Sequence, residues 1–256
     1  MNFLVTAGGT VEQIDSVRSI TNSATGRLGS LIADELAGRE ETAGIWYICG
    51  KTAARPQTPR AEILPIGDTA TLEAEVRRVL AGRRIDGIIH TMAVSDYRVS
   101  ALTTPRLMAE SLLAARENSA GGLPDREGIL RGIQQAPVLD RGGKIDSGEQ
   151  KLILILEPTV KVISLFRGLA PKAVLVGFKL LHDVPHEALI NTAYALLEKN
   201  HCDFVLANDD RDIHGDCHAA YLIDRDRRIS PYGDKQSIAR GIVSRVIAKI
   251  REQWGK

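Results

Sequence analysis

Short runs of apolar residues alternate along the chain with longer segments in which apolar residues recur at helical spacing. The short runs predict strands near 2–7, 44–49, 62–65, 87–91, 151–156, 173–178 and 204–207. The periodic segments predict helices near 27–37, 69–81, 159–169 and 184–200. Strands that are apolar on both sides and alternate with helices are typical of a parallel sheet covered on both faces. The pattern therefore predicts an α/β fold of three layers.

Near its end the chain changes pattern. Two apolar runs, 218–223 and 228–231, flank a charged turn and predict a small β-hairpin. The last helix is expected at 235–253, where Ile238 and Ile242 begin an apolar face. These elements complete the expected fold of one domain.

The segment 101–147 breaks the alternation, because it is rich in Arg, Glu, Gly and Ser and contains no strand-like run. A long irregular insert in a compact α/β domain is usually a lid, a binding loop or disorder. We therefore expect a flap here, poorly ordered without ligand, inside a single domain that spans 1–256.

Composition narrows the class of protein. The 256 residues are 44% hydrophobic and 25% charged, as in ordinary globular proteins. With 33 Lys and Arg against 32 Asp and Glu, the net charge of +1 gives no reason to expect nucleic acid or a membrane surface as partner. The chain opens on a strand without a leader pattern, and its three cysteines form no disulfide framework, so we expect a reducing cytoplasm.

The first candidate functional residues lie in the polar loop after the first strand. Two glycines, Gly8 and Gly9, end the strand, and a second glycine turn around Gly26 opens a helix. Backbone N–H groups at such a turn, aided by the helix dipole, bind phosphate oxygens. The insert between them carries Asp15 and Asn22, for which an ordinary dinucleotide fold has no room. These residues predict a nucleotide site, although such glycines equally mark tight helix–strand packing.

The same segment resembles the phosphopantothenoylcysteine synthetase family, also called phosphopantothenate–cysteine ligase, of coenzyme A biosynthesis. The resemblance continues through Ala93-Val94-Ser95-Asp96-Tyr97-Arg98, Lys144-Ile145, Val176-Gly177-Phe178 and Ala207-Asn208-Asp209. It covers the chain from residue 4 to about 210 with the exception of 101–147. It implies a Rossmann-like three-layer αβα sandwich, a stand-alone synthetase without a decarboxylase domain, and a homodimer.

Residue roles follow from this resemblance. Asn22 matches the asparagine that holds an acyl-nucleotide, Lys144 the flap lysine that reaches it, and Arg18 an arginine that orients the loop. The implied nucleotide contacts are Gly8, Gly9, Thr10, Thr25, Gly26, Met92, Asp96, Lys144, Pro158, Thr159, Val160, Phe178 and Lys199. Pro158 is expected to start a helix, Phe178 to pack on the base and Lys199 to bind phosphate, with Asn200 as the alternative register. The chain departs from the family pattern at Asp146, Glu157 and Leu181.

The resemblance implies a ligation in two steps. The carboxylate of 4′-phosphopantothenate attacks the α-phosphate of CTP or ATP, and the amine of L-cysteine then displaces the nucleotide. Mg²⁺ and a mobile cation offset the repulsion between the two anions. The sequence does not identify ligands for the metal.

Other interpretations stay open. The turn around Gly26 also resembles that of short-chain dehydrogenases, whose Tyr-x-x-x-Lys spacing occurs here only at Tyr47 and Lys51. A non-catalytic nucleotide-binding relative is the third possibility. Each of four expected contacts also has a purely structural explanation. Asp96 fits a helix cap and Phe178 fits a core position. Lys144 fits a solvated loop residue, and Lys199 fits a lysine that interacts with the helix dipole. His214, Cys217 and His218 fit a solvated turn better than a zinc site.

Overall fold

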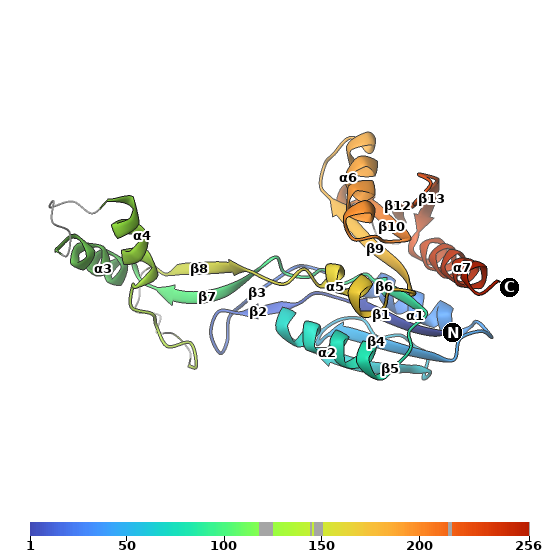
Figure 1. The fold of residues 1–256 in the computed structure, drawn as a ribbon, viewed down its shortest axis with the longest axis horizontal. Helices are drawn as coiled ribbons and strands as arrows, with labels where there is room; N and C mark the ends of the chain where they lie inside the picture. Colours follow the sequence, from blue (N-terminus) through green and yellow to red (C-terminus); the bar gives the residue numbers. More distant parts are fainter. Residues whose placement is uncertain (118–124, 144, 146–150, 215–216, 256) are drawn as a thin grey trace. The chain divides into compact units, whose positions relative to one another are not determined.

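The computed structural model of the chain describes residues 1–117, 125–143, 145, 151–214 and 217–255. Its contacts divide the chain into two compact units (Figure 1). The first unit comprises Met1–Val11, Thr21–Val94 and Val160–Lys256, and the second comprises Glu12–Ile20 and Ser95–Thr159. Among the described residues, no helix is both long and apolar enough to cross a membrane.

The first unit is built on one sheet with the strand order β11-β12-β10-β9-β6-β1-β4-β5, and β13 pairs with β12 (Figure 1). Its strands are β1 (Asn2–Ala7), β4 (Gly44–Gly50), β5 (Ala61–Ile66), β6 (Gly87–His90), β9 (Val174–Leu181), β10 (Phe204–Asp209), β11 (Ile213–His214), β12 (Cys217–Asp224) and β13 (Ile229–Asp234). From β5 to β10 the neighbours run parallel, whereas β12 runs antiparallel to β10, β11 and β13. The predicted parallel sheet and C-terminal hairpin are confirmed.

Helices cover both faces of this sheet. On one face α1 (Arg27–Ala37) and α7 (Lys235–Gln253) bury Ile32 and Ile242 against Phe3 and Val5. On the other face, Leu4 packs in the core that contains residues of α2 (Thr69–Gly82), α5 (Val162–Leu169) and α6 (His186–Lys199). Successive strand residues point to opposite faces, so adjacent residues of β1 enter different cores. The expected three layers are therefore confirmed, with one short 3₁₀ helix, η1 (Asp210–Asp212), after β10.

The second unit contains a two-stranded antiparallel ribbon of β7 (Tyr97–Thr103) and β8 (Ile153–Pro158), with α3 (Pro105–Glu117) and α4 (Arg126–Gln134) at one end (Figure 1). A separate short sheet pairs β2 (Val11–Gln13) with β3 (Ser19–Thr21). The strand predicted at 151–156 is thus real, but its assignment to the parallel sheet is wrong. Its alternating half-buried and exposed residues suit a ribbon that is covered on one face.

The expectation of an irregular 101–147 is wrong where the chain forms the end of β7, α3 and α4, whereas 136–143 have no regular structure. Poor order without ligand stays a prediction. Asp125 caps α4 by accepting a hydrogen bond from the backbone N–H of Gly128 at 2.7 Å. Gly132 allows a close contact with Leu112 of α3, and the Ser111 hydroxyl donates to the Gly132 carbonyl at 2.8 Å. A glycine such as Gly132 can allow two helices to pack closely or can lie in a loop, and composition alone does not distinguish the two.

One glycine at the start of α1 gives a direct test of the packing. A methyl group on Gly29 would lie 2.5 Å from the Ala7 Cβ and 2.8 Å from the Thr91 hydroxyl oxygen. We expect Gly29→Ala to lower the free energy of unfolding by about 2 kcal/mol through overpacking. Gly38→Ala is the matched control, because its added methyl would meet nothing closer than 3.5 Å. Denaturant titration measures both, and equal stabilities would contradict this packing.

Candidate functional site

The carboxyl ends of β1 and β6 lie side by side and form the centre of the candidate site in the first unit. Thr6 is level with His90 in the parallel register, and beyond them Gly9 forms an isolated bridge with Ala93. The Ala93 N–H donates to the Gly8 carbonyl at 2.9 Å. Ligands of open α/β sheets bind beyond this edge, so the chain's glycine turn is in the position expected for a nucleotide site.

The glycines at this edge are explained by close packing. Gly8 and Gly26 have positive φ angles of 83° and 73°. A methyl group on either would lie within 3.0 Å of the Ala53 Cβ, and one on Gly50 would lie 2.6 Å from the Gly9 carbonyl oxygen. The structural interpretation of the glycine turn is therefore supported, and phosphate binding at Gly8, Gly9 and Gly26 stays a prediction.

Asn22 is fixed to the loop that follows β6. Its side-chain N–H donates to the Val94 carbonyl at 3.3 Å, and the neighbouring Thr21 hydroxyl donates to the Thr10 carbonyl at 2.9 Å. The carbonyl oxygen of the Asn22 amide accepts no hydrogen bond from the described residues, and the residue is exposed. The amide is thus anchored to protein by its donor, while its acceptor has no partner among the described residues.

Several expected nucleotide contacts have buried side chains. Thr10 is fully buried and its hydroxyl accepts from Thr69 at 3.4 Å, while Met92 packs in the core on the α2 face. A ligand at this edge would therefore meet these two residues through their backbone. Thr25 is exposed, and its carbonyl accepts from the Ala54 N–H at 2.9 Å.

A buried histidine supports the same edge. The His90 ring nitrogen Nδ1 lies 2.7 Å from the Thr6 hydroxyl, and the ring meets Phe166 edge-on with centroids 5.1 Å apart. Complete burial lowers the pKa of His90 to about 4. His90 is consequently uncharged at neutral pH and serves here as a packed strand residue.

In the second unit Asp96 and Thr159 are brought together. The Thr159 N–H donates to the Asp96 carbonyl at 3.0 Å, and its hydroxyl donates to the Ser95 carbonyl. The helix predicted to start at Pro158 is corrected, since Pro158 ends β8 and α5 begins only at Val162. Thr159 and Val160 thus precede the helix and do not form its first turn.

Glu157 forms an ion pair that the sequence did not predict. Arg98 and Glu157 are paired across β7 and β8, and their side chains form an ion pair with an N–O distance of 2.6 Å. Both side chains remain partly exposed, so the pair adds little stability. It does partly neutralise the carboxylate that would otherwise repel phosphate.

Asp15 anchors the polar loop and the base of the expected flap. It is 2% exposed and accepts hydrogen bonds from the backbone N–H groups of Val17 at 2.9 Å, Arg18 at 2.7 Å and Ile145 at 3.4 Å. Arg18 pairs with Asp15 at 2.9 Å and donates to the Ile145 carbonyl at 2.9 Å. Lys144 lies outside the described residues, but its neighbour Ile145 is held on both its N–H and its C=O.

A second arginine strengthens this connection. Arg141 donates to the carbonyls of Ile14 at 2.9 Å, Val99 at 2.8 Å and Gln13 at 2.5 Å. Hydrogen bonds from Val17 and Arg18 outweigh the effect of burial and lower the pKa of Asp15. Arg141 is a functional candidate that sequence reasoning missed, whereas Asp15 was noted in the polar insert but given no role of its own.

Phe178 and Lys199 lie on different edges of the sheet. Phe178 is level with Leu206 and packs partly buried against the core on the α1 face, beyond the end of β6. Lys199 is the last residue of α6, which returns the chain to the amino edge where β10 begins. Asn22 and the glycine turn lie at the opposite edge of the sheet, and phosphate binding by Lys199 stays a prediction.

Asp209 links the loops after β9 and β10 at the carboxyl edge. Its carboxylate accepts from the backbone N–H groups of Val184 at 3.0 Å, Arg211 at 3.0 Å and Asp183 at 3.2 Å. These bonds lower its pKa to about 2. In the sequence the Asn208-Asp209 pair shows only a family match, and no local pattern predicts this turn.

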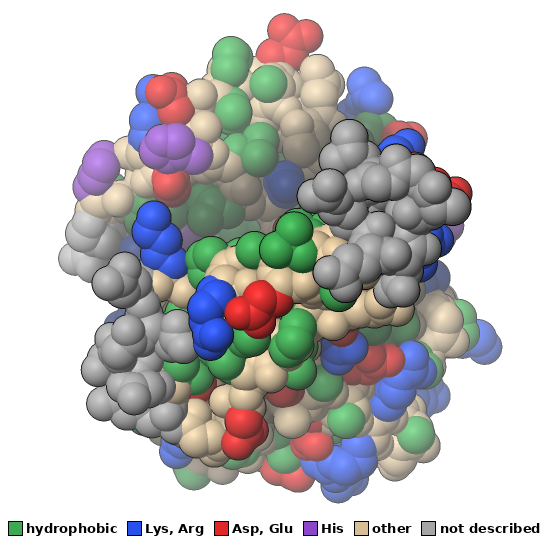
Figure 2. Space-filling model, turned by 90° about the vertical axis from the view of Figure 1, so that its left-hand side faces the viewer, with side chains coloured by type: hydrophobic (Ala, Val, Ile, Leu, Met, Phe, Trp, Pro, Cys, Tyr) green, Lys and Arg blue, Asp and Glu red, His purple; other side chains and the backbone are tan. Residues whose placement is uncertain are grey.

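Charges and metal ligands are dispersed. On the face in Figure 2, acidic and basic side chains are interspersed among hydrophobic ones and form no large patch of one sign among the described residues. Within the part of the chain that the structure describes, no three His, Cys, Asp or Glu side chains are grouped to hold a metal ion. The expectation that His214, Cys217 and His218 do not bind metal stays a prediction.

Comparison with known proteins identifies the family. The family model described as the DNA/pantothenate metabolism flavoprotein C-terminal domain matches residues 1–112 and 136–250, and the chain belongs to this family. The coenzyme A biosynthesis bifunctional protein CoaBC of Thermococcus kodakarensis is 31% identical over 87% of this chain and 45% of its own length. The protein of the same name from Mycolicibacterium smegmatis is 26% identical over 98% and 54%. The chain spans about half the length of the curated relatives it matches.

Solved structures agree with this assignment. The DNA/pantothenate metabolism flavoprotein from Streptococcus pneumoniae has a TM-score of 0.77 and 33% identity, over 97% of this chain and 99% of that one. A Cab2 mutant in complex with phosphopantothenate-cysteine has a TM-score of 0.69 over 98% and 86%, and its 16% identity supports the fold alone. The Rossmann-like α/β architecture is thus confirmed.

Removing the Asp15 charge should loosen the flap base. We expect Asp15→Asn to raise the hydrogen-exchange rates of the Val17, Arg18 and Ile145 amides by about tenfold, because three N–H groups lose a charged acceptor. Asp140→Asn is the matched control, since Asp140 accepts only from the Gly142 N–H at 2.9 Å among its described contacts. Unchanged exchange at Ile145 in Asp15→Asn would contradict the anchoring role.

The low pKa of Asp209 makes stability depend on pH. Because its pKa falls from 3.8 to about 2 on folding, ionised Asp209 stabilises the protein above about pH 4, and this contribution is lost as the pH falls through about 2. Between about pH 5 and pH 3 the wild type should therefore lose more unfolding free energy than Asp209→Asn. Denaturant unfolding at several pH values tests this, and identical slopes for wild type and Asp209→Asn would refute it.

Proposed function

We propose that this chain is a phosphopantothenate–cysteine ligase that works through an acyl-nucleotide intermediate. The observation that carries the proposal is the exposed Asn22 amide, anchored through Val94 beyond the carboxyl ends of β1 and β6. Family membership supports it, as do the names of relatives that act in coenzyme A biosynthesis. The Cab2 structure contains phosphopantothenate-cysteine, the product that such a ligation yields.

In the first step the phosphopantothenate carboxylate attacks the α-phosphorus of a nucleoside triphosphate. A new P–O bond forms, the bond to the β-phosphate breaks, and pyrophosphate leaves with its electron pair. Both reactants are anions, so the step needs cations placed before reaction. We assign this role to Lys144, with Asp15 and Arg18 as positioning residues that hold the adjacent Ile145.

In the second step the cysteine amine attacks the acyl carbon. The C–N bond forms, the C–O bond to the phosphate breaks, the nucleoside monophosphate leaves, and the ammonium loses a proton. The Asn22 amide is suited to hold the mixed anhydride, because its exposed oxygen accepts while its nitrogen is kept in place by Val94. We therefore assign to Asn22 the alignment of the intermediate for attack by cysteine.

The nucleotide and the metal are less closely defined. We propose CTP or ATP as the co-substrate, with Mg²⁺ as its counterion. All three cysteines are free thiols, and we propose that the enzyme works in a reducing cytoplasm.

Contacts around Tyr47 disfavour the dehydrogenase alternative. Its hydroxyl donates to the Ala54 carbonyl at 2.7 Å, and the side chain is fully buried in the core. Burial raises the pKa of Tyr47, whereas a proton-transferring tyrosine needs a lowered one. The non-catalytic alternative loses one of its arguments, because Arg98 compensates the unusual Glu157.

We also propose that the chain forms a homodimer. In the second unit Leu113, Ile129, Leu130 and Val138 are exposed hydrophobic side chains, and Figure 2 shows hydrophobic side chains at the surface of the face it presents. Exposed apolar groups of this kind mark protein interfaces when they lie together. Sedimentation velocity distinguishes this dimer from a monomer, and a monomer at micromolar concentration would refute it.

A pyrophosphate-release assay with 4′-phosphopantothenate, Mg²⁺ and CTP or ATP tests the proposed function. We expect sustained release only when L-cysteine is present, because turnover requires the intermediate to be consumed. Asn22→Ala should release about one pyrophosphate per site and form the amide at least about 100-fold more slowly. Lys144→Gln should slow the release itself by a similar factor, since charge compensation fails in the first step.

Two substitutions control for general effects. Asn191→Ala removes an exposed amide from α6, and Lys151→Gln removes an exposed lysine beyond the flap; both should retain wild-type rates. No pyrophosphate release by folded wild-type protein with either nucleotide would rule out the ligase. Equal loss in Asn22→Ala and Asn191→Ala would rule out the role of Asn22.

A further inference from the structure

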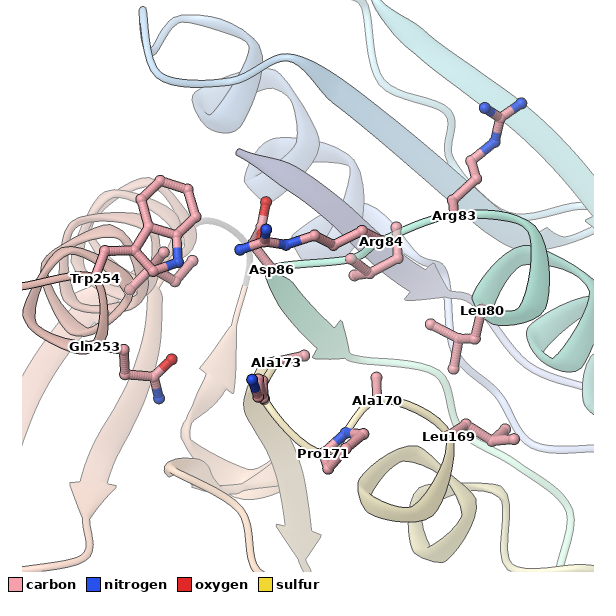
Figure 3. Close-up of a pocket in the computed structure, with 13 residues that line it drawn as sticks. Leu80, Arg83, Arg84, Asp86, Leu169, Ala170, Pro171, Ala173, Gln253 and Trp254 are labelled. Atoms are coloured by element: carbon pink, nitrogen blue, oxygen red, sulfur yellow. The ribbon is translucent and has the colours of Figure 1, made fainter.

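A cavity of about 780 Å³ opens at the amino edge of the sheet in the first unit (Figure 3). Asp86 and Ala173, which immediately precede β6 and β9, line it together with the last turn of α7. The candidate site lies beyond the carboxyl ends of these parallel strands. The cavity is therefore separate from the proposed ligase chemistry, and its volume is within the range of small-molecule sites.

The walls of the cavity are largely apolar. Leu80, Ile85, Leu169, Ala173 and Ile250 line it, and the Trp254 indole, 40% exposed, lies at its rim. Figure 3 shows Trp254 and Gln253 on one side of the opening and Leu80 and Leu169 on the other. An apolar recess with one exposed indole suits a flat apolar ring, because stacked aromatic rings gain energy beyond the area they bury.

The polar groups of the rim leave a positive charge. Arg84 pairs with Asp86 at 3.1 Å and its guanidinium lies 5.6 Å from the Trp254 ring centroid. Asp86 also accepts from the Asn2 N–H at 2.8 Å, so the one carboxylate that lines the cavity already has two partners. Arg83, which also lines the cavity, lies 4.0 Å from the Glu62 carboxylate and 4.7 Å from the Trp46 ring centroid. Lys172 lines the same cavity and forms no ion pair or hydrogen bond with the described residues, so its ammonium is the charge left for a ligand.

The cavity wall that carries Lys172 is held in place by the protein itself. Arg167 donates to the carbonyls of Pro171 at 3.0 Å and Ala173 at 2.9 Å, on either side of Lys172. The same arginine pairs with Asp203 at 3.0 Å. A recess that is already formed binds with less loss of conformational entropy than one that must be ordered by its ligand.

We propose that this cavity is a second ligand site, which takes a small amphipathic anion with a flat aromatic ring and one carboxylate or sulfonate. The ring packs on the apolar wall beside Trp254, and the anionic group meets Lys172. Nothing in this site depends on the proposed ligase activity. Its ligand is chemically distinct from a nucleoside triphosphate, whose charge is several times larger.

The probe for a direct test is anilinonaphthalene sulfonate, which has both features. We expect saturable binding of one probe per chain to the full-length protein, followed by probe fluorescence. Trp254→Ala should weaken the probe affinity about tenfold and Lys172→Ala about threefold. Lys249→Ala removes an equal charge from the end of α7 outside the cavity lining and should leave the affinity unchanged.

The two tryptophans provide an internal control. In ¹H–¹⁵N spectra the indole N–H signal of Trp254, assigned with Trp254→Phe, should shift on probe addition, whereas that of Trp46 should not. Added CTP, ATP or 4′-phosphopantothenate should not displace the probe, since the expected substrate edge is at the other end of the strands. Non-saturable binding, equal effects of Lys172→Ala and Lys249→Ala, or displacement by these substrates would overturn the proposal.

Discussion

The first unit depends on the close approach of four backbone segments at the end of β1. Gly29 brings α1 against Ala7, while Gly8 and Gly26 both make room for the methyl group of Ala53. No larger residue fits these contacts without displacing a strand or a helix. Because α1 and the turn after β4 are fixed in this way, the part of the polar segment that directly precedes them, residues 21–23, lies at the surface. Its exposure is what makes Asn22 available to a ligand.

Buried carboxylates then give shape to loops that have no regular structure. Asp15 accepts backbone N–H groups from its own loop and from Ile145, 130 residues further along the chain, while Arg18 donates to the Ile145 carbonyl. Asp209 likewise joins the loops after two neighbouring strands. A carboxylate that accepts several N–H bonds stays ionised well below its usual pKa. A buried carboxylate that accepts several backbone N–H groups thus organises one loop in each unit.

Much of the first unit could be predicted because its signal is local. The apolar runs of β1 and the helical period of α7 place these elements at the residues where the structure has them. The second unit could not be predicted in this way, since α3 and α4 carry many charged residues and meet through Gly132. The antiparallel partner of β8 was equally hidden, because a strand's neighbour is set by tertiary contacts and not by its own pattern.

The residue roles of the candidate site come from the resemblance to the ligase family, and the structure shows where the described ones among these residues lie. The roles of Asn22 and Lys199 both come from that resemblance. The structure places Asn22 beyond the carboxyl ends of β1 and β6 and Lys199 at the end of α6, where a lysine also suits the helix dipole. The topology of the sheet determines at which edge each of the two residues lies. A helix between parallel strands returns the chain to the amino edge, so Lys199 and Asn22 lie at opposite edges of the sheet in the first unit. By the same geometry β6, four residues and about 13 Å long, separates the cavity beside Asp86 from the site beyond His90. Two ligands that bind at the ends of one strand must influence each other equally, if they do so at all, because coupling between binding free energies is reciprocal.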